Sequence, residues 1–440
     1  MGSPSGLSLS DFNLGLLEFL QSSPTAFHAA GEIRSRLLAA GFIGLDEADN
    51  WQLEPGKSYV ITRNDSSVIA FTYGFNSLIK NGISILGAHT DSPCLKIKPR
   101  PELNRRGYSQ LGVEVYGGAL LAPWFDRDLS IAGRVSYRNQ QNTIASVLVD
   151  FKDPIAFIPS LAIHLDREAN NSRSINPQKD IVPVLLQTDD AGLSPDFKTL
   201  LKQQMDVKYP ELTSAAILDY EMNLYDTQAP ALVGLQKQFI ASARLDNLLS
   251  CYVGLSAILS ADHQESALFI ATDHEEVGST SCCGAKGPML QQFLERLIPD
   301  PQERARCIDR SVMISADNAH GVHPNFMDKH DENHGPILNK GPVIKINANQ
   351  RYATTSDTSG LFRSLCELEQ IPVQVFVART DMGCGSTIGP VVSSEVGVKT
   401  VDVGVPTFAM HSIREIAGDK DAWHLYRIAR RFFSGTLKIN

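Results

Sequence analysis

A short apolar run at residues 266–271 (S-A-L-F-I-A) is followed at once by the charged stretch T-D-H-E-E-V-G-S at residues 272–279. A run of this kind is typical of a buried strand, so His274, Glu275 and Glu276 are expected where that strand ends. Two adjacent carboxylates resist ionising together unless a positive charge lies nearby. A metal ion would supply that charge, with one carboxylate as ligand and the other as proton carrier. A solvated acidic loop is the simpler alternative.

Similar apolar runs recur along the chain and alternate with stretches of helical spacing. Strands are predicted at residues 83–88, 239–243, 311–316 and 399–403, and helices at residues 246–260 and 419–433. Near the N-terminus, Ser23 followed by Pro24 predicts the start of a helix. This alternation favours an α/β fold whose mostly parallel sheet is flanked by helices.

The character of the chain changes from about residue 96, where short β-rich segments and long loops replace the alternation. The alternation returns near residue 239. We therefore predict a catalytic domain formed by residues 1–95 and 232–440. Residues 96–231 are predicted to form an inserted β-rich domain.

Composition and charge exclude several classes of function. The formal net charge is -9 over 440 residues, whereas a nucleic-acid-binding surface needs a basic face. No apolar run approaches the ~20 residues of a membrane span, and no secretory signal pattern is visible. Seven cysteines at irregular spacing suit free thiols. We expect a cytoplasmic protein that binds neither nucleic acid nor membrane.

Ionisable residues follow five of the predicted strands. Ligands of open α/β sheets bind at the carboxyl ends of the strands, so these side chains are expected to lie together. Each residue alone is more simply explained by a structural role, but their joint placement favours a metal site. The candidates are His89, Asp91, Asp246, Glu275, Glu276, Asp317 and His411.

Two His and three carboxylates without Cys suit zinc, with cobalt or manganese as alternatives. Two zinc ions about 3.5–4 Å apart need a bridging carboxylate. The predicted arrangement has Asp246 as the bridge, His89 with Asp317 on one ion, and Glu276 with His411 on the other. Glu275 is left as the general base, which takes a proton from the attacking water and passes it to the leaving amine. The H-E-E-V-G segment lacks the second His of a helical zincin motif.

Several sequence blocks extend over nearly the whole chain. They are S-P-T-A-F-H-A-A at 23–30, G-A-H-T-D-S-P at 87–93, P-W-F-D-R-D-L at 123–129, A-R-L-D-N at 243–247, D-H-E-E-V-G-S at 273–279, S-A-D-N-A-H-G-V-H-P-N at 315–325, G-S-T-I-G-P at 385–390 and the pair at 411–412. Through them the chain resembles the aspartyl aminopeptidases, which are di-zinc exopeptidases that remove acidic N-terminal residues. The resemblance implies the same ligand set, two zinc ions per subunit and Glu275 as base. It also implies that Asp91 orients His89 rather than binding metal.

The resemblance implies roles for four further residues. His320 matches a substrate-contacting histidine of the family, although from the sequence alone it fits a polar loop or a second metal cluster. Lys345 and Tyr352 match positions that hold the substrate, and a lysine there would pair with an acidic side chain. His164 matches a histidine that enters the active site of a neighbouring subunit.

The family assembles from dimers into a tetrahedral shell of twelve subunits. The resemblance therefore implies a homo-oligomer, an insert that serves dimerisation, and short peptides with acidic N-termini as substrates. Residues 381–383 have the form found in bacterial members, where the shape of the pocket can differ. Alternatives are a broader aminopeptidase, a carboxypeptidase or N-deacylase on a related zinc fold, and a non-catalytic shell.

Overall fold

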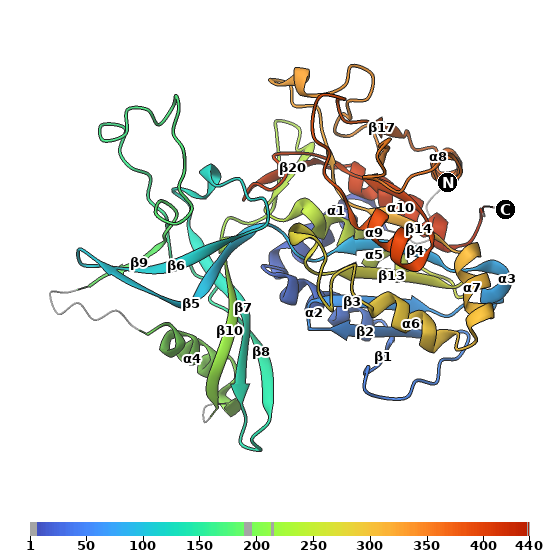
Figure 1. Ribbon diagram of the computed structural model, residues 1–440, viewed down its shortest axis with the longest axis horizontal. Coiled ribbons are helices and arrows are strands. Elements are labelled where there is room, and N and C mark those ends of the chain that lie inside the picture. The colour runs from blue at the N-terminus through green and yellow to red at the C-terminus, as the bar shows by residue number, and fades with distance from the viewer. Residues whose placement is uncertain (1–6, 189–195, 213–214, 438, 440) are drawn as a thin grey trace. The chain divides into compact units, whose positions relative to one another are not determined.

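The computed structural model describes residues 7–188, 196–212, 215–437 and 439 (Figure 1). The chain divides into two compact units. The first unit consists of Met1–Asp91, Pro230–Met410 and Glu415–Asn440, and the second of Ser92–Ala229 and His411–Arg414. Helices and sheets occur together, so the predicted mixed α/β fold agrees with the structure.

The first unit is built around a large central sheet. Its strands are β1 (Ile43–Gly44), β2 (Ser58–Arg63), β3 (Ser67–Thr72), β4 (Ser84–His89), β13 (Ala267–Thr272), β14 (Val312–Ala316), β16 (Val343–Lys345), β17 (Gln374–Phe376) and β18 (Lys399–Gly404). Among the described residues they form nine strands in the order β1-β2-β3-β13-β4-β14-β18-β16-β17. The central strands β13, β4, β14 and β18 pair in parallel, as predicted. Antiparallel pairs flank them.

A smaller sheet also belongs to the first unit. Its strands are β11 (Ala231–Val233), β12 (Phe239–Ser242), β15 (Ala319–His320), β19 (Pro406–Phe408) and β20 (Glu415–Gly418), in the order β11-β12-β20-β19-β15. The predicted strand at residues 239–243 is β12, so it exists but lies outside the central sheet. It pairs antiparallel with β20, which follows it by about 170 residues in the chain.

Helices cover both faces of the central sheet (Figure 1). They are α1 (Leu9–Ser22), α2 (Ala26–Ala39), α3 (Leu78–Asn81), α5 (Leu245–Ile258), α6 (Met289–Leu297), α7 (Pro301–Arg310), α8 (Ser356–Leu368), α9 (Ile388–Val396) and α10 (Asp421–Phe433). Alternate residues of β13 belong to different apolar clusters. Phe269 belongs to the cluster that includes residues of α1, α2, α5, α8 and α10, whereas Ile270 belongs to the cluster that includes residues of α6 and α9.

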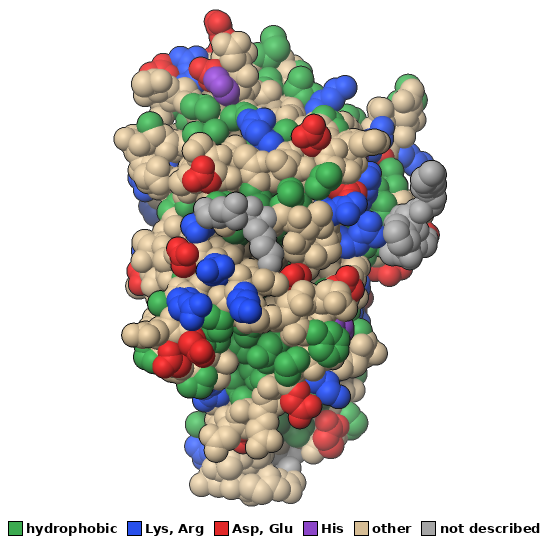
Figure 2. Space-filling view, turned by 90° about the vertical axis from the view of Figure 1, so that its right-hand side faces the viewer, with side chains coloured by type: hydrophobic (Ala, Val, Ile, Leu, Met, Phe, Trp, Pro, Cys, Tyr) green, Lys and Arg blue, Asp and Glu red, His purple; other side chains and the backbone are tan. Residues whose placement is uncertain are grey.

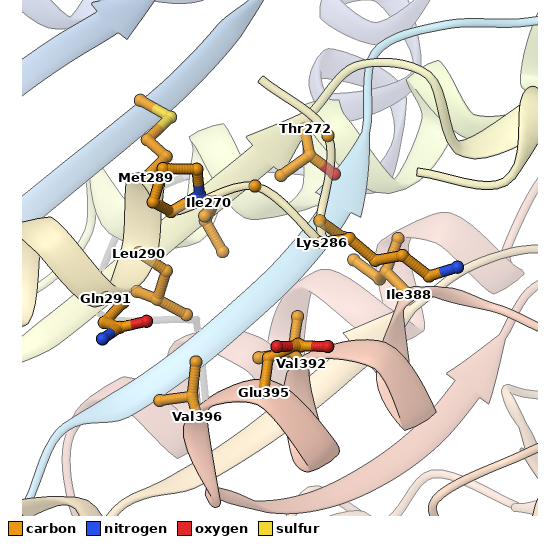
Figure 3. A pocket seen from close by; sticks show the side chains of 14 residues that line it. Ile270, Thr272, Lys286, Met289, Leu290, Gln291, Ile388, Val392, Glu395 and Val396 are labelled. Carbon is orange, nitrogen blue, oxygen red and sulfur yellow. The ribbon is translucent and has the colours of Figure 1, made fainter. Parts of the chain in front are cut away.

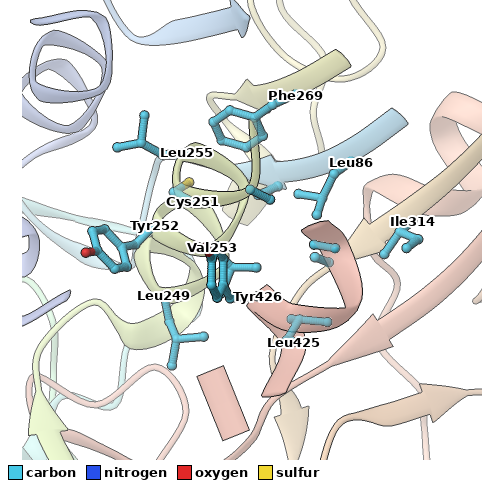
Figure 4. Packing of buried hydrophobic residues seen from close by; sticks show 14 of the residues in the cluster. Leu86, Leu249, Cys251, Tyr252, Val253, Leu255, Phe269, Ile314, Leu425 and Tyr426 are labelled. Atoms are coloured by element: carbon cyan, nitrogen blue, oxygen red, sulfur yellow. The ribbon is translucent and has the colours of Figure 1, made fainter. Parts of the chain in front are cut away.

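Helix α5 is buried on all sides, as its apolar sequence requires. Figure 4 shows its Leu249 and Val253 beside Leu425 and Tyr426 of α10. Helix α2 corrects one prediction, because its N-cap is Thr25 and not Ser23. The Thr25 side chain accepts a hydrogen bond from the His28 N–H at 3.4 Å.

The second unit contains an antiparallel sheet of six described strands in the order β8-β7-β10-β5-β6-β9. They are β5 (Cys94–Arg105), β6 (Tyr108–Tyr116), β7 (Leu129–Arg138), β8 (Ile144–Asp150), β9 (Val184–Gln187) and β10 (Ala216–Asp226). Helix α4 (Phe197–Lys208), which the sequence analysis did not predict, contributes Phe197, Leu201 and Met205 to the core of this unit.

Short 3-10 turns complete the chain at η1 (Ala122–Trp124), η2 (Pro210–Leu212), η3 (Glu275–Val277) and η4 (Met327–Lys329).

None of the helices in the described part of the chain is both long and apolar enough to cross a membrane. On the face drawn in Figure 2, Lys and Arg side chains are interspersed with Asp and Glu side chains.

Candidate metal centre and active site

Three parallel strands place predicted ligands at one edge of the central sheet. His89 is the last residue of β4 and lies opposite Thr272, the last residue of β13. Asp317 directly follows β14, whose Ser315 lies opposite Gly87 of β4. Because these strand ends are level, the segments that follow them meet at the same edge.

His89 is at the centre of this cluster and is buried. Its Nε2 lies 3.4 Å from Asp246 Oδ1, 3.6 Å from Asp317 Oδ1 and 3.9 Å from Glu275 Oε2. One ligand atom from each of His89, Asp246 and Glu276 lies within 4.8 Å of the other two. The structure therefore brings together three predicted ligands in a compact set, with Asp317 and Glu275 beside them.

The Asp91 carboxylate binds the backbone of the predicted base Glu275 and of the predicted ligand Glu276. Its Oδ1 accepts the Glu275 N–H and its Oδ2 accepts the Glu276 N–H, both at 3.1 Å. On the other side, His89 Nδ1 lies 3.0 Å from the Asp91 carbonyl oxygen and 3.4 Å from Asp91 Oδ1. Asp91 thus contacts both His89 and the turn η3, and a carboxylate beside a metal-binding histidine is a usual form of support.

The pKa shifts of the buried carboxylates indicate that a bound cation would stabilise the cluster. Burial is the largest cause that raises the pKa of Glu275 to about 7, and nearby carboxylates add to it. Burial, followed by repulsion from Asp246, raises the pKa of Glu276 to about 10. Burial opposes charge on His89, yet its hydrogen bonds with Asp246 and Asp317 raise the pKa of His89 well above its ordinary value. A divalent cation would satisfy these crowded carboxylates, and one imidazole with carboxylates is a donor set that fits zinc.

Comparison with known proteins identifies the family. The family model described as "Aminopeptidase I zinc metalloprotease (M18)" matches residues 19–433. The chain belongs to the M18 family of zinc aminopeptidases. A "Probable M18 family aminopeptidase 2" from Pseudomonas putida is 59% identical over 422 residues, which cover 96% of this chain and 97% of that relative.

Solved structures of M18 aminopeptidases have the same fold. Yeast aminopeptidase 1 (Ape1) is 28% identical with a TM-score of 0.84, and the match covers 97% of each chain. The S. cerevisiae mApe1 dodecamer is 29% identical with a TM-score of 0.82, covering 97% of this chain and 96% of that one. The resemblance stated from the sequence blocks is thus confirmed at the level of the M18 zinc aminopeptidases.

Lys345 of this M18 aminopeptidase is buried, with only 3% of its surface exposed, and it lies beside the predicted ligand Asp317. Its Nζ is 3.3 Å from Asp317 Oδ2 and 5.5 Å from the centroid of the Tyr352 ring. Burial would raise the pKa of Asp317, but the charge of Lys345, together with the contacts to His89 and Asp246, lowers it. Lys345 is therefore a buried residue and not a surface lysine. Tyr352 is buried and packs with Phe376.

His320 is exposed at the end of β15, and its ring lies 5.7 Å from that of Phe376 in an edge-to-face arrangement. The neighbouring histidines make local contacts. His334 Nδ1 lies 2.6 Å from Asp331 Oδ1, and His323 Nδ1 accepts the Asn325 N–H. Among the described residues these histidines do not form a group of three metal donors, so the second metal cluster considered above finds no support.

Two predicted residues belong to the second unit. His411 Nδ1 lies 3.2 Å from the Gly118 carbonyl oxygen of the same unit, and its role as a metal ligand stays a prediction. His164 is exposed in a turn closed by a hydrogen bond from the Leu165 N–H to the Ala162 carbonyl oxygen. His164 therefore lies in a turn and not in a strand.

Glu415 is a part of the site that the sequence analysis missed. It is only 1% exposed, and its Oε2 accepts the Asp246 N–H at 2.8 Å. Its only signal in the sequence is a charged residue between the apolar Ile413 and Ile416.

A separate pocket lies between β13, α6 and α9 (Figure 3). Its walls are mainly apolar, with Lys286 and Glu395 among the labelled residues. Its lining residues differ from all of the predicted site residues.

Proposed function

We propose that this M18 aminopeptidase removes N-terminal Asp or Glu from short peptides, using two zinc ions and Glu275 as general base. The observation that carries this proposal is the cluster around His89, in which buried carboxylates, an imidazole and a lysine lie within a few ångströms of one another. Cobalt or manganese are alternative metals for the same oxygen and nitrogen donors.

Two ions would use the donors in the arrangement expected from the sequence. His89 and Asp317 would hold one ion, Asp246 would bridge, and Glu276 and His411 would hold the other. When bound, the ions supply positive charge that polarises the peptide carbonyl and acidifies water. The Glu415 carboxylate supports this role for Asp246 by holding its backbone N–H.

Glu275 would move the proton. Its carboxylate lies beside His89 at 3.9 Å, and Asp91 fixes its backbone through the N–H. From this position it would take a proton from the attacking water and deliver it to the leaving amine. The chain contains the predicted base and all of the predicted ligands, which disfavours the alternative of a non-catalytic shell.

Lys345 gives the proposal its preference for acidic substrates. An ammonium group has three donors, so its contact with Asp317 leaves donors for a substrate carboxylate. Tyr352 lies next to that ammonium and would shape the pocket, with His320 as a further substrate contact. The carboxylate of an acidic substrate would then give the buried Lys345 ammonium group a hydrogen-bond partner in place of the water that burial excludes.

The homo-oligomer is proposed from the S. cerevisiae mApe1 dodecamer, which this chain resembles in fold. Leu161, Ile163 and Leu165 are exposed around His164. Exposed apolar side chains of this kind often mark protein interfaces. We infer a cytoplasmic dodecamer built from dimers, in which the second unit pairs subunits and His164 enters a neighbouring active site.

The test is a comparison of substrates with the purified, zinc-loaded protein. Anilides of Asp and Glu should be cleaved faster than the anilide of Leu, and a chelator should abolish the activity until zinc is restored. Faster cleavage of Leu would replace the acidic preference with a broader aminopeptidase. Cleavage confined to N-acylated compounds would favour the N-deacylase alternative. Mass measurement in solution distinguishes a dodecamer from smaller species.

A further inference from the structure

A second group of metal-binding side chains lies on the loop that carries the proposed base. One ligand atom from each of Asp273, His274 and Cys283 lies within 4.8 Å of the other two. Asp273 and Cys283 are buried, and the His274 side chain is 27% exposed. This group shares no residue with the predicted zinc ligands, and it contains a thiol where that set contains none.

The thiol and the carboxylate lie at different nitrogens of the imidazole. Cys283 Sγ is 3.5 Å from His274 Nδ1, whereas Asp273 Oδ2 is 3.5 Å from His274 Nε2. Ser281 Oγ lies on the thiol side, 2.8 Å from His274 Nδ1 and 3.5 Å from Cys283 Sγ. The ring is therefore held between a carboxylate on one side and a sulfur with a hydroxyl on the other.

This arrangement matches the geometry of a thiolate–imidazole metal site. With Zn–S near 2.3 Å and Zn–N near 2.0–2.1 Å, tetrahedral bonding places sulfur and nitrogen roughly 3.5 Å apart. We propose that Cys283 Sγ and His274 Nδ1 bind a thiophilic divalent cation, zinc or cadmium, with Asp273 orienting the imidazole through Nε2. A carboxylate behind a metal-binding histidine is the usual form of such support.

Other groups near the imidazole would complete the coordination of the ion. The Ser281 hydroxyl lies within reach, and the partly exposed side of His274 gives access to water and to the ion. The Cys283 thiol loses its proton to solvent when the ion binds, because only the thiolate is a strong ligand. Since the donors come from both ends of residues 273–283, an ion here would close this loop around η3.

Cadmium binding followed by ultraviolet absorption tests the proposal on the full-length, zinc-loaded protein. A cadmium–thiolate bond gives a charge-transfer band, and the oxygen and nitrogen ligands predicted at the other centre give none. We expect the band to saturate at about one equivalent of cadmium. Cys283→Ser should abolish it, whereas Cys282→Ser, which removes the adjacent exposed thiol, should leave it unchanged. Asp273→Asn should weaken binding roughly 10–100-fold.

Three results would overturn the site: no band in the unmodified protein, a band that survives Cys283→Ser, or a band lost only in Cys282→Ser. His274→Gln keeps every thiol and serves if Cys283→Ser fails to fold. It should weaken cadmium binding at least about tenfold, and unchanged binding would exclude the imidazole as a ligand. Because absorption needs no turnover, these outcomes are independent of the peptidase assay.

Discussion

Glu275 and Glu276 are adjacent in the chain, yet the proposed chemistry gives them different tasks. One ligand atom of Glu276 lies in the compact set with His89 and Asp246. Glu275 lies at the rim of that set, with its Oε2 3.9 Å from His89 Nε2. The same substitution at the two positions should therefore have different effects. Glu275→Gln keeps the size of the side chain and removes its capacity to accept a proton.

The expected loss follows from the value of general base catalysis, which is about 10²–10⁴ in rate. The kcat of Glu275→Gln for an aspartyl anilide should fall by that factor, which corresponds to about 2.7–5.4 kcal/mol in activation free energy. Zinc per chain after dialysis should stay unchanged, because the backbone of Glu275 is still held by Asp91. The matched variant Glu276→Gln should lose zinc, since it removes a carboxylate from the donor set.

Both variants are compared by zinc analysis, steady-state kinetics and circular dichroism at one protein concentration. A Glu275→Gln protein that retains more than about a tenth of the activity would remove Glu275 as the base. Zinc loss in Glu275→Gln with full zinc in Glu276→Gln would reverse the two assignments.

Three further predictions concern specificity, pH and packing. Lys345→Met should lower kcat/KM for aspartyl substrates at least about tenfold more than for leucyl substrates, because the buried cation is lost; equal losses would refute its role. The metal-free protein should melt at lower temperature as pH rises from about 5 to 9, because the folded state holds a proton on Glu276 (pKa about 10) that the unfolded state releases near its ordinary value; zinc should abolish this trend. Gly254→Ala should cost about 1–3 kcal/mol in unfolding free energy, measured by urea denaturation, because the added methyl meets the Phe269 ring; unchanged stability would contradict this packing.

Much of the site could be predicted because several of its residues lie at the ends of strands or directly after them. The run before Glu276 predicts a buried strand, and parallel pairing then places Thr272 level with His89. Local apolar patterning is sufficient for this step, because the carboxyl ends of parallel strands meet at one edge. The same logic gave Asp317 after β14.

Local sequence patterns do not predict the structure where long-range strand pairing decides it. Residues 239–243 were predicted as a strand whose end presents Asp246 at the edge of the central sheet. Instead β12 pairs with β20, and Asp246 reaches His89 from the first turn of α5. The buried Glu415 that holds Asp246 is part of β20, so it could be recognised only once this pairing was known. The local sequence of β12 does not indicate that it pairs with β20, and the local sequence of β20 does not indicate that it pairs with β12.

The backbone at His274 explains how one short segment can serve two groups of donors. His274 has φ 63, in the left-handed region that residues with a Cβ seldom adopt. The chain turns sharply there, so the His274 ring lies against Cys283 while the next two residues lie against Asp91 and the His89 cluster. A regular strand would also point successive side chains to opposite faces, but it would carry Glu276 away from the edge where His89 ends. The turn therefore separates a sulfur-containing group from an oxygen-rich one within a few residues, and metals of different softness can be directed to different sides of the same loop.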